Sequence, residues 1–345
     1  MIKFDAMKSI TPQAKQRVTR HRVILGTVAA PVLLASTLAC GQQNAATDYP
    51  RKPIRIIVGF TPGGGPDITA RYVAQKLTEA WRQQVIVDNR PGAGGTVGAN
   101  LVANANPDGY TLLSVSSAHA VAPALYAKLP YDTKKDLAGI TQTATSKYVL
   151  VVAPSLGLKT LKELIALAKV KAGQMNFSSA GVGSGTHFAA EQFQAMAGIK
   201  VVHVPFKGIP EAVTETMSGR VQYFMAPIAN SVNLVKEGKL VGLGVSSPQR
   251  DVLLPDIPTI AEAGVAGYQA ELWFGLLTSA MAPKPIVSRL NGEIRRIMSQ
   301  ADVKQRWAPI GLEPRATTPA DFDKLVASDI ALFTKIARAA NIKAE

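Results

Sequence analysis

The feature that most constrains the fold is a regular alternation, from Tyr49 onward, of short β-branched or apolar runs with amphipathic helical stretches. Strands that alternate with helices build sheets rich in parallel pairs, with helices on both faces. The sequence therefore predicts the α/β class. The expected strands are Ile54–Phe60, Val85–Asp88, Thr111–Val115, Tyr148–Ala153, Met175–Ser178, Val201–Pro205, Val221–Met225 and Leu240–Val245.

Helix boundaries between these runs are marked by capping residues. Thr160 and Glu163 form a capping box before Leu161–Ala168, and Gly198 follows Phe188–Ala197. Further helices are expected over Ile68–Trp81, Pro210–Ser218 and from Thr318 to about Ala340.

The first forty residues have the layout of a secretory signal peptide. A basic stretch that ends at Arg22 precedes the apolar run Val23–Ala39, which is shorter than the roughly 20 residues of a membrane-spanning helix. Cys40 stands where a lipoprotein signal carries its lipidated residue, although Thr37 replaces the expected Leu, so lipidation stays open. We expect residues 1–46 to be a leader and the protein to be periplasmic, with or without an anchor at Cys40.

The charge and cysteine content exclude several classes of function. The net charge is +14, but six of the basic residues lie within 1–46, and the others are spread along the chain without Arg/Lys blocks. Few aromatic residues (6%) are present for base stacking, so nucleic-acid binding is not expected. The single Cys excludes a disulfide framework and a thiolate metal cluster.

The part of the chain that follows the leader is large for a single core, which predicts two lobes. The sequence has no long Gly/Ser-rich or Pro-rich linker, so we expect the join to be a pair of extended crossings near Ala144–Val152 and Glu271–Leu277. This places 47–147 plus 272–345 in the first lobe and 148–271 in the second.

Two glycine-rich loops have the features of anion sites. Thr61-Pro-Gly-Gly-Gly-Pro-Asp67 follows one expected strand, Ser178–His187 follows another, and each leads into a helix. Glycines let the backbone approach a ligand, and the N-terminus of a helix presents N–H groups and partial positive charge. Both phosphate and carboxylate fit such a loop, but the nucleotide patterns G-x-x-x-x-G-K-[ST] and G-x-G-x-x-G are absent.

Two other segments are open to a structural or a functional interpretation. The glycine-rich stretch Asn89–Gly98 reads more readily as a turn, although it also precedes a helix. In Val204–Gly208, Lys207 either neutralises a carboxylate or is an ordinary exposed turn residue. His119 follows a strand end and is a candidate for the cleft, whereas His203 is expected in or beside the core.

The sequence does not favour an enzyme. The alternative from another class is a secreted hydrolase that uses Ser184 or Ser179 with His187. A nucleophile elbow around Ser184 needs Gly at the position of Val182, so the motif is absent. The histidines lack the H-x-x-x-H spacing of a zinc site, and Asp67 is the only acid in either loop. No catalytic residue, metal or cofactor is expected.

A series of ordered motifs resembles the tripartite tricarboxylate transporter receptors, also called Bug proteins. The match covers essentially Tyr49–Glu345. The similar segments are Tyr49–Phe60, Pro62–Asp67, Asn89–Gly95, Pro107–Leu113, Leu129–Asp132, Ser179–Gly183 with His187, Val204–Gly208, Leu254–Thr259, Glu262–Gly264 and Trp273–Gly275.

The resemblance implies the two-lobed, clamshell periplasmic-binding fold (type II), with a parallel-rich mixed sheet in each lobe, and a small carboxylate held between the lobes. It also implies a set of cleft residues. Carried over by motif, these are Phe60, Thr61, Pro62, Gly64, Asp67, Ser116, Ser117, Ser179, Ala180, Thr186, His187, Pro205, Lys207 and Ala226.

The chain departs from the family pattern at two places. Trp81-Arg82 replaces the usual turn that contains Gly, and Phe206 stands where Tyr is common, which removes a hydroxyl donor. The second departure bears on ligand preference.

These observations together predict a monomeric exported receptor. It would close around a di-, tri- or aromatic carboxylate and deliver it to the permease subunits of a tripartite tricarboxylate-type transporter. A receptor that senses the same acids for a signalling partner fits the sequence equally, because the partner surface has no readable motif.

Overall fold

The computed structural model describes residues 48–126, 128–339 and 342. The expected leader over 1–46, including Cys40, lies outside the described residues. Within the described part, we find no helix with both the length and the apolar character needed to span a bilayer.

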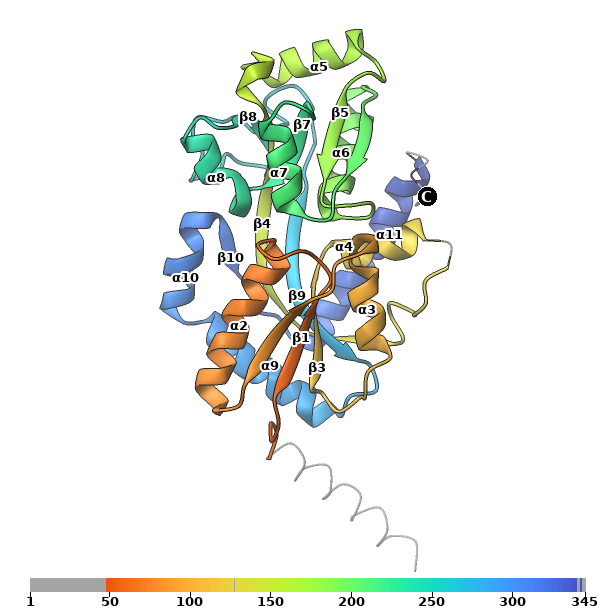
Figure 1. Ribbon diagram of the computed structural model, residues 1–345, viewed down its shortest axis with the longest axis vertical. Helices are drawn as coiled ribbons and strands as arrows, with labels where there is room; N and C mark the ends of the chain where they lie inside the picture. The colour runs from red at the N-terminus through yellow and green to blue at the C-terminus, as the bar shows by residue number, and fades with distance from the viewer. Residues whose placement is uncertain (1–47, 127, 340–341, 343–345) are drawn as a thin grey trace, which may run out of the picture. The chain divides into compact units, whose positions relative to one another are not determined.

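Ten hydrogen-bonded strands organise the described residues and divide into two sheets that share β4 (Figure 1). In the first sheet, β1 pairs in parallel with β2 and β3, whereas β9 is antiparallel to β3 and β4, and β10 is antiparallel to β4. Its strands are β1 (Ile54–Val58), β2 (Val85–Asn89), β3 (Thr111–Ser116), β9 (Glu271–Ser279), β10 (Leu312–Pro314) and the first part of β4 (Leu137–Val152).

The second sheet is also mixed. The end of β4 pairs antiparallel with β7 and β8, and β5 pairs in parallel with β6 and β7. Its other strands are β5 (Asn176–Ser179), β6 (Val202–Pro205), β7 (Tyr223–Pro227) and β8 (Val241–Val245). The prediction of an α/β fold with a mixed sheet in each lobe is confirmed. The sheets are not rich in parallel pairs, however, because the first has two parallel and three antiparallel pairs and the second has two of each.

The two sheets are joined through β4 and β9, which run between the two groups of elements in Figure 1. On β4, Lys147 is paired with Glu271 of β9, and the next residue, Tyr148, is paired with Pro227 of β7. The chain therefore enters the second sheet along β4 and returns to the first at the start of β9. We call the elements around the first and second sheets the first and second lobes.

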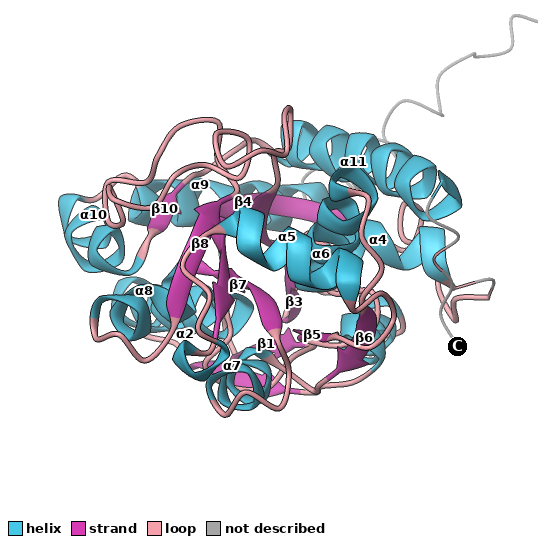
Figure 2. Ribbon diagram, turned by 90° about the horizontal axis from the view of Figure 1, so that it is seen from above, coloured by secondary structure: helices cyan, strands magenta, loops and turns pink. Residues whose placement is uncertain are grey.

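Helices surround the strands in each lobe (Figure 2). Those of the first lobe are α2 (Gly65–Trp81), α3 (Thr96–Ala103), α4 (Ala118–Leu125), α9 (Lys284–Met298), α10 (Ala301–Trp307) and α11 (Pro319–Ala339). Those of the second lobe are α5 (Leu161–Val170), α6 (Gly185–Ala197), α7 (Ile209–Met217) and α8 (Ile228–Lys236). Short 3₁₀ turns occur at Ala93–Gly95, Pro154–Leu156 and Ala308–Ile310.

Both faces of the sheets are buried, because successive side chains of a strand point to opposite faces. In β7, Tyr223 and Met225 share a core with Phe193 of α6, whereas Phe224 and Ala226 pack in the core that contains residues of α7 and α8. Strands buried on both sides need apolar side chains at every position, which explains the continuous apolar runs in the sequence.

Seven of the eight expected strands lie within two residues of the observed ones, but the expected Tyr148–Ala153 is only the end of the 16-residue strand β4. Strand β10 and helices α4, α8, α9 and α10 were not anticipated. Helix α4 lacks an amphipathic pattern because most of its residues are buried, and it contains Pro123.

The turn after α2 is made by a residue poorly suited to it. Arg82 caps the helix in the left-handed conformation, with φ 54° and ψ 25°, and its N–H donates to the Thr78 carbonyl at 2.9 Å. A side chain at this backbone geometry is strained by contact with its own carbonyl. This backbone geometry therefore favours glycine, and Arg82 adopts it at the cost of that strain.

We therefore expect Arg82→Gly to be more stable than Arg82→Ala by about 1 kcal/mol, because both variants lose the exposed Arg side chain and only Gly loses the Cβ. Urea unfolding of the two variants and the parent protein measures the difference. An Ala variant as stable as the Gly variant would show that the turn carries no strain.

Candidate functional site

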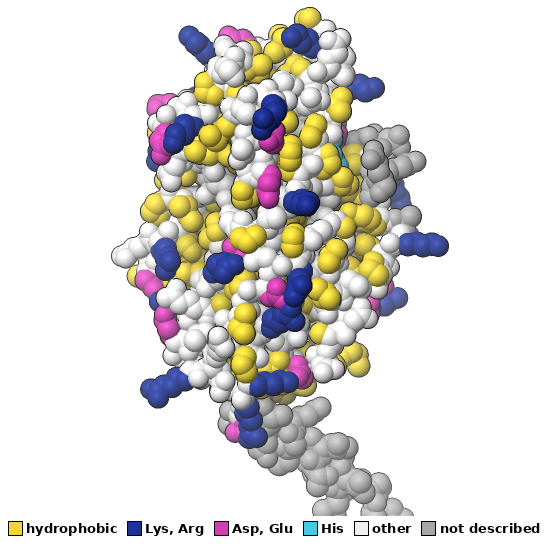
Figure 3. Space-filling view, viewed as in Figure 1, with side chains coloured by type: hydrophobic (Ala, Val, Ile, Leu, Met, Phe, Trp, Pro, Cys, Tyr) yellow, Lys and Arg dark blue, Asp and Glu magenta, His cyan; other side chains and the backbone are white. Residues whose placement is uncertain are grey.

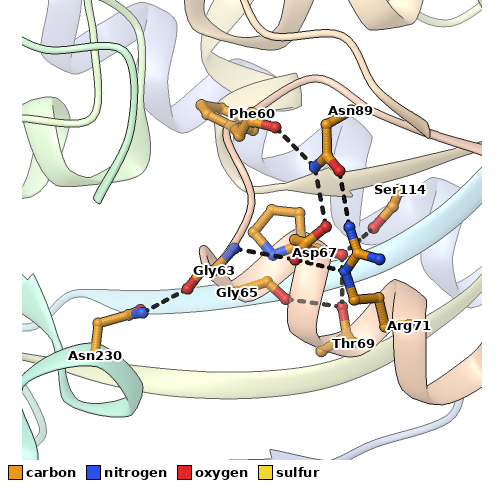
Figure 4. Close-up of polar contacts among 10 residues, drawn as sticks. Phe60, Gly63, Gly65, Asp67, Thr69, Arg71, Asn89, Ser114 and Asn230 are labelled. Carbon is orange, nitrogen blue, oxygen red and sulfur yellow. Dashed lines mark hydrogen bonds and ion pairs between the residues drawn. The ribbon is translucent and has the colours of Figure 1, made fainter. Parts of the chain in front are cut away.

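The first glycine loop connects β1 to α2 and is held in place by a buried carboxylate (Figure 4). Asp67 accepts hydrogen bonds from the Gly63 N–H at 3.0 Å, from Asn89 Nδ2 at 2.9 Å and from Arg71 Nε at 2.9 Å. Asn89 Nδ2 also donates to the Phe60 carbonyl at 3.0 Å. These hydrogen bonds to Asp67 therefore fix the conformation of the loop.

Burial alone raises the pKa of Asp67, but hydrogen bonds from Arg71, Gly63 and Asn89 outweigh it and keep the pKa below its ordinary value. The carboxylate is thus ionised at neutral pH. It is committed to the loop and does not line the cavity described below, contrary to the expectation for a cleft residue.

Asp67→Asn should lower the free energy of unfolding by about 2 kcal/mol, because an amide cannot accept all three donors and lacks the charge that pairs with Arg71. Glu237→Gln is the control, since Glu237 pairs with Lys239 at an exposed site and its loss should cost less than about 1 kcal/mol. Urea unfolding measures both. Equal losses would contradict the role of Asp67 in the loop.

The second glycine loop connects β5 to α6 and is fastened by hydroxyl groups. Ser184 caps α6 by accepting from the His187 N–H at 3.2 Å, and Thr186 Oγ1 accepts from the Ala180 N–H at 2.9 Å. Ser184 Oγ and Thr186 Oγ1 are also hydrogen-bonded to each other at 2.9 Å. The expected residue Thr186 thus supports the loop as well as lining the cavity.

Beneath this loop lies a stack of aromatic rings. Ser179 Oγ is 2.6 Å from His203 Nε2, and the rings of His203 and His187 stack with their centroids 3.9 Å apart. Ser179 and His187 are buried and do not line the cavity. The Ser179 partner is therefore His203 and not His187, so the hydrolase pairing that the sequence suggested is not formed.

The starts of α2 and α6, one from each lobe, line a common narrow cavity of about 30 Å³. We call it the interlobe cavity. Its walls also include residues of β3, β9 and α7 and the loops beside them. The lining residues are Phe60, Thr61, Gly64, Gly65, Pro66, Ser116, Ala180, Ser184, Gly185, Thr186, Ile209, Pro227, Leu272 and Phe274.

Glycine at both helix starts follows from packing. A Cβ on Gly65 would overlap the Phe274 ring, and a Cβ on Gly185 would lie 2.5 Å from Tyr148 Oη and 2.8 Å from Ser117 Oγ. Helix α2 therefore begins in direct contact with β9. Helix α6 begins in contact with β4 and with Ser117, which follows β3. A side chain at either position would push the helix N-terminus away from the cavity.

Several donors in the cavity have no acceptor among the described residues. Thr61 Oγ1 is buried against Gly208 without a hydrogen-bond partner among the described residues, and within the same residues the backbone N–H groups of Gly64, Gly65, Gly185 and Thr186 have no acceptor. The first N–H groups of a helix have no acceptor within the helix and carry partial positive charge. The cavity is thus built to receive an acceptor, above all an anion.

A wider depression, which we call the mouth, adjoins the cavity and shares Phe60 and Ala180 with it. It is lined by Gly59 and Phe60 before the first glycine loop and by parts of the other two glycine-rich stretches, so Asn89–Gly98 contributes Pro91–Gly94 to the border of the site. Pro205, Phe206, Lys207 and Glu211 complete it.

The fourteen expected cleft residues thus divide into three groups. Phe60, Thr61, Gly64, Ser116, Ala180 and Thr186 line the cavity, and Pro205 and Lys207 line the mouth. The others lie elsewhere: Pro62 is exposed on the loop, Asp67, Ser179, His187 and Ala226 are buried, and Ser117 lines a separate depression beside Trp273.

Sequence reasoning missed eight of the lining residues. Gly65, Pro66, Ser184 and Gly185 belong to the two loops already recognised, so the helix starts were the available signal. Ile209, Pro227, Leu272 and Phe274 carry no polar signal and reach the cavity only through the tertiary fold.

His119 lies in a smaller cavity behind Phe60 and Ser116. Its Nε2 is buried without a partner among the described residues, and burial lowers its pKa to about 4. In the unfolded chain a histidine has a pKa of about 6.5, so between these values only the unfolded chain binds the proton. Stability therefore falls as the pH falls through this range.

We expect His119→Gln to remove a slope of up to about 1.4 kcal/mol per pH unit from the free energy of unfolding between roughly pH 6.5 and pH 4. Urea unfolding of the parent protein and the variant at several pH values measures the slope. The buried carboxyls Asp323 and Asp329, whose pKa values burial raises, are common to both proteins and cancel in the comparison. Parallel pH profiles would contradict the prediction.

Neither lobe shows a metal centre, because no group of three or more His, Cys, Asp or Glu side chains suited to a metal is found in the described residues. On the face shown in Figure 3, Lys and Arg side chains are interspersed with acidic and apolar ones and form no continuous basic stripe.

Two lobes joined by two long strands, with opposing helix N-termini lining one cavity, define a solute-binding protein of the periplasmic type. The model of the tripartite tricarboxylate transporter family receptor matches residues 69–342. The chain belongs to this family.

Individual relatives agree with this assignment. Protein BugT of Bordetella pertussis is 31% identical over 328 residues, which is 94% of this chain and 99% of BugT. A solved structure of an R. palustris protein with adipate has 31% identity and a TM-score of 0.83, covering 86% of this chain and 99% of that chain. MatC of Rhodopseudomonas palustris with bound malate has 30% identity and a TM-score of 0.80, covering 84% and 99%.

Proposed function

We propose that the protein is an extracytoplasmic receptor that binds a small organic carboxylate between its lobes and delivers it to the membrane permease of a tripartite tricarboxylate-type transporter. The observation that carries the proposal is the interlobe cavity, where two helix N-termini present unpaired N–H groups. Backbone N–H groups at helix starts bind carboxylate oxygens without a cationic side chain. The family and its adipate and malate complexes support this ligand class.

We assign residues 47–147 and 272–345 to the first lobe and residues 148–271 to the second. Residues 1–46 are the export leader, and Cys40 is the candidate anchor. The change of β4 partners at Lys147 and Tyr148 supports the boundaries. Of the lining residues, we assign carboxylate contact to the Thr61 hydroxyl and to the N–H groups of Gly64, Gly65, Gly185 and Thr186.

Closure of the lobes follows from ligand contacts to both of them. A ligand that bonds to the starts of α2 and α6 together binds the closed state more tightly than the open state, and so shifts the population towards it. The lobes already meet beside the cavity, where Asn230 Nδ2 of α8 donates to the Gly63 carbonyl at 2.8 Å (Figure 4). The surface of the closed form is then the one that the permease recognises.

None of the residues that line the cavity pairs a nucleophile with a general base, so we propose no reaction.

We expect one or more acids in a panel of aliphatic and aromatic mono-, di- and tricarboxylates to raise the melting temperature of protein that has been unfolded and refolded to remove carried ligand. A ligand at about 100 times its Kd adds roughly 2.7 kcal/mol. Thr61→Val should weaken binding about tenfold, because it removes a donor to a charged group while keeping the side-chain shape.

Thr214→Val is the control, since Thr214 lies on the exposed side of α7 and bonds only to the Pro210 carbonyl. It should leave the affinity unchanged. No shift with any acid, or chemical conversion of a bound acid, would overturn the proposed function.

A further inference from the structure

The walls of the interlobe cavity are mainly hydrocarbon. Phe60, Leu272 and Phe274 come from the first lobe and the strands that join the lobes, and Ile209 and Pro227 come from the second. All but Phe60 are buried. An apolar ligand body gains by leaving water for such walls, whereas a second polar group would find few partners there.

The positive charge in the cavity comes from the backbone alone. None of the fourteen lining residues is Lys, Arg, His, Asp or Glu. Helix N-termini carry partial positive charge; α2 and α6 begin in the cavity wall, and Ile209 and Pro227 place the starts of the shorter helices α7 and α8 beside it. A second carboxylate buried there would have no cationic side chain to pair with.

The hydroxyl groups of the cavity are uncharged and cannot neutralise a second carboxylate. Ser184 and Thr186 accept the His187 and Ala180 N–H groups and share one proton between them, which leaves one proton of this pair and that of Ser116 as neutral donors. Thr61 is the lining hydroxyl with a buried and unpartnered oxygen. These donors are enough for the two oxygens of one carboxylate, together with the helix N–H groups.

The mouth offers no net charge to a second carboxylate that reaches out of the cavity. Lys207 is exposed there, and Glu211 lines the same depression with a buried Oε2 that has no partner among the described residues. The attraction of a distal carboxylate to Lys207 is thus opposed by repulsion from Glu211. Phe206 beside them adds a further apolar surface.

We propose that this receptor selects acids with one carboxylate and a hydrocarbon body over diacids of the same length. The inference rests on the proposed function, because it concerns the ligand of the same cavity. The proposed preference for monoacids distinguishes this receptor from the R. palustris proteins whose structures contain the diacids adipate and malate.

Hexanoate and adipate test the inference directly, because they have the same chain length and differ only in the second carboxylate. Titration calorimetry of the full protein at about pH 7.5, where both acids are ionised, should give at least tenfold tighter binding of hexanoate. Benzoate and terephthalate form a second, aromatic pair, and the monoacid should again bind more tightly.

Glu211→Gln examines the charge argument separately. The variant should bind adipate several-fold more tightly than the parent protein does, with hexanoate unchanged within twofold, because only the diacid places charge near the mouth. An unchanged adipate affinity would overturn the role of Glu211.

The possible failures are distinct. A diacid that binds as tightly as its matched monoacid, or a tricarboxylate that binds when both monoacids fail, overturns the inference and leaves the receptor function standing. If no acid of the wider panel binds, the proposed function fails first.

Discussion

The binding site depends on the direct contact of two helix starts with the strands that join the lobes. Gly65 of α2 lies against the Phe274 ring of β9, and Gly185 of α6 lies against Tyr148 of β4. Neither position has room for a Cβ, so only glycine lets the helix N-termini reach the cavity. Because the two helices belong to different lobes, a ligand that bonds to both also holds the lobes together.

The polar groups of the two loops have two different tasks. Asp67 and Ser184 use their oxygens to hold the loops, through bonds to Gly63 and to the His187 N–H. Thr61 and the first helix N–H groups have no hydrogen-bond partner among the described residues. The residues most conspicuous in the sequence therefore support the loops, and the donors left free in the cavity are mostly backbone N–H groups. Such preorganised donors need no rearrangement when an anion arrives.

How far the sequence predicted the molecule differs between local and long-range features. The capping box of Thr160 and Glu163 is present, and a helix follows each glycine loop, although α2 and α6 begin three residues earlier than expected, at Gly65 and Gly185. These features depend on residues within one turn of each other. The length of β4 was missed because a buried strand is recognised in a sequence by a run of apolar residues. The first part of β4, Leu137–Lys147, instead contains several Thr, Gln and Ser residues. Pairing with β9 and β10 makes this segment a strand.

The sequence by itself determined the α/β class, the two glycine loops at helix starts and the membership of the receptor family, because these depend on local patterns and on motifs in a fixed order. The tertiary structure decided which residues line the interlobe cavity. It turned Asp67, Ser179 and His187 into the supports of the loops and brought Phe274, about 200 residues away in the chain, against Gly65. Burial and packing between distant segments set these positions, and no local pattern records them.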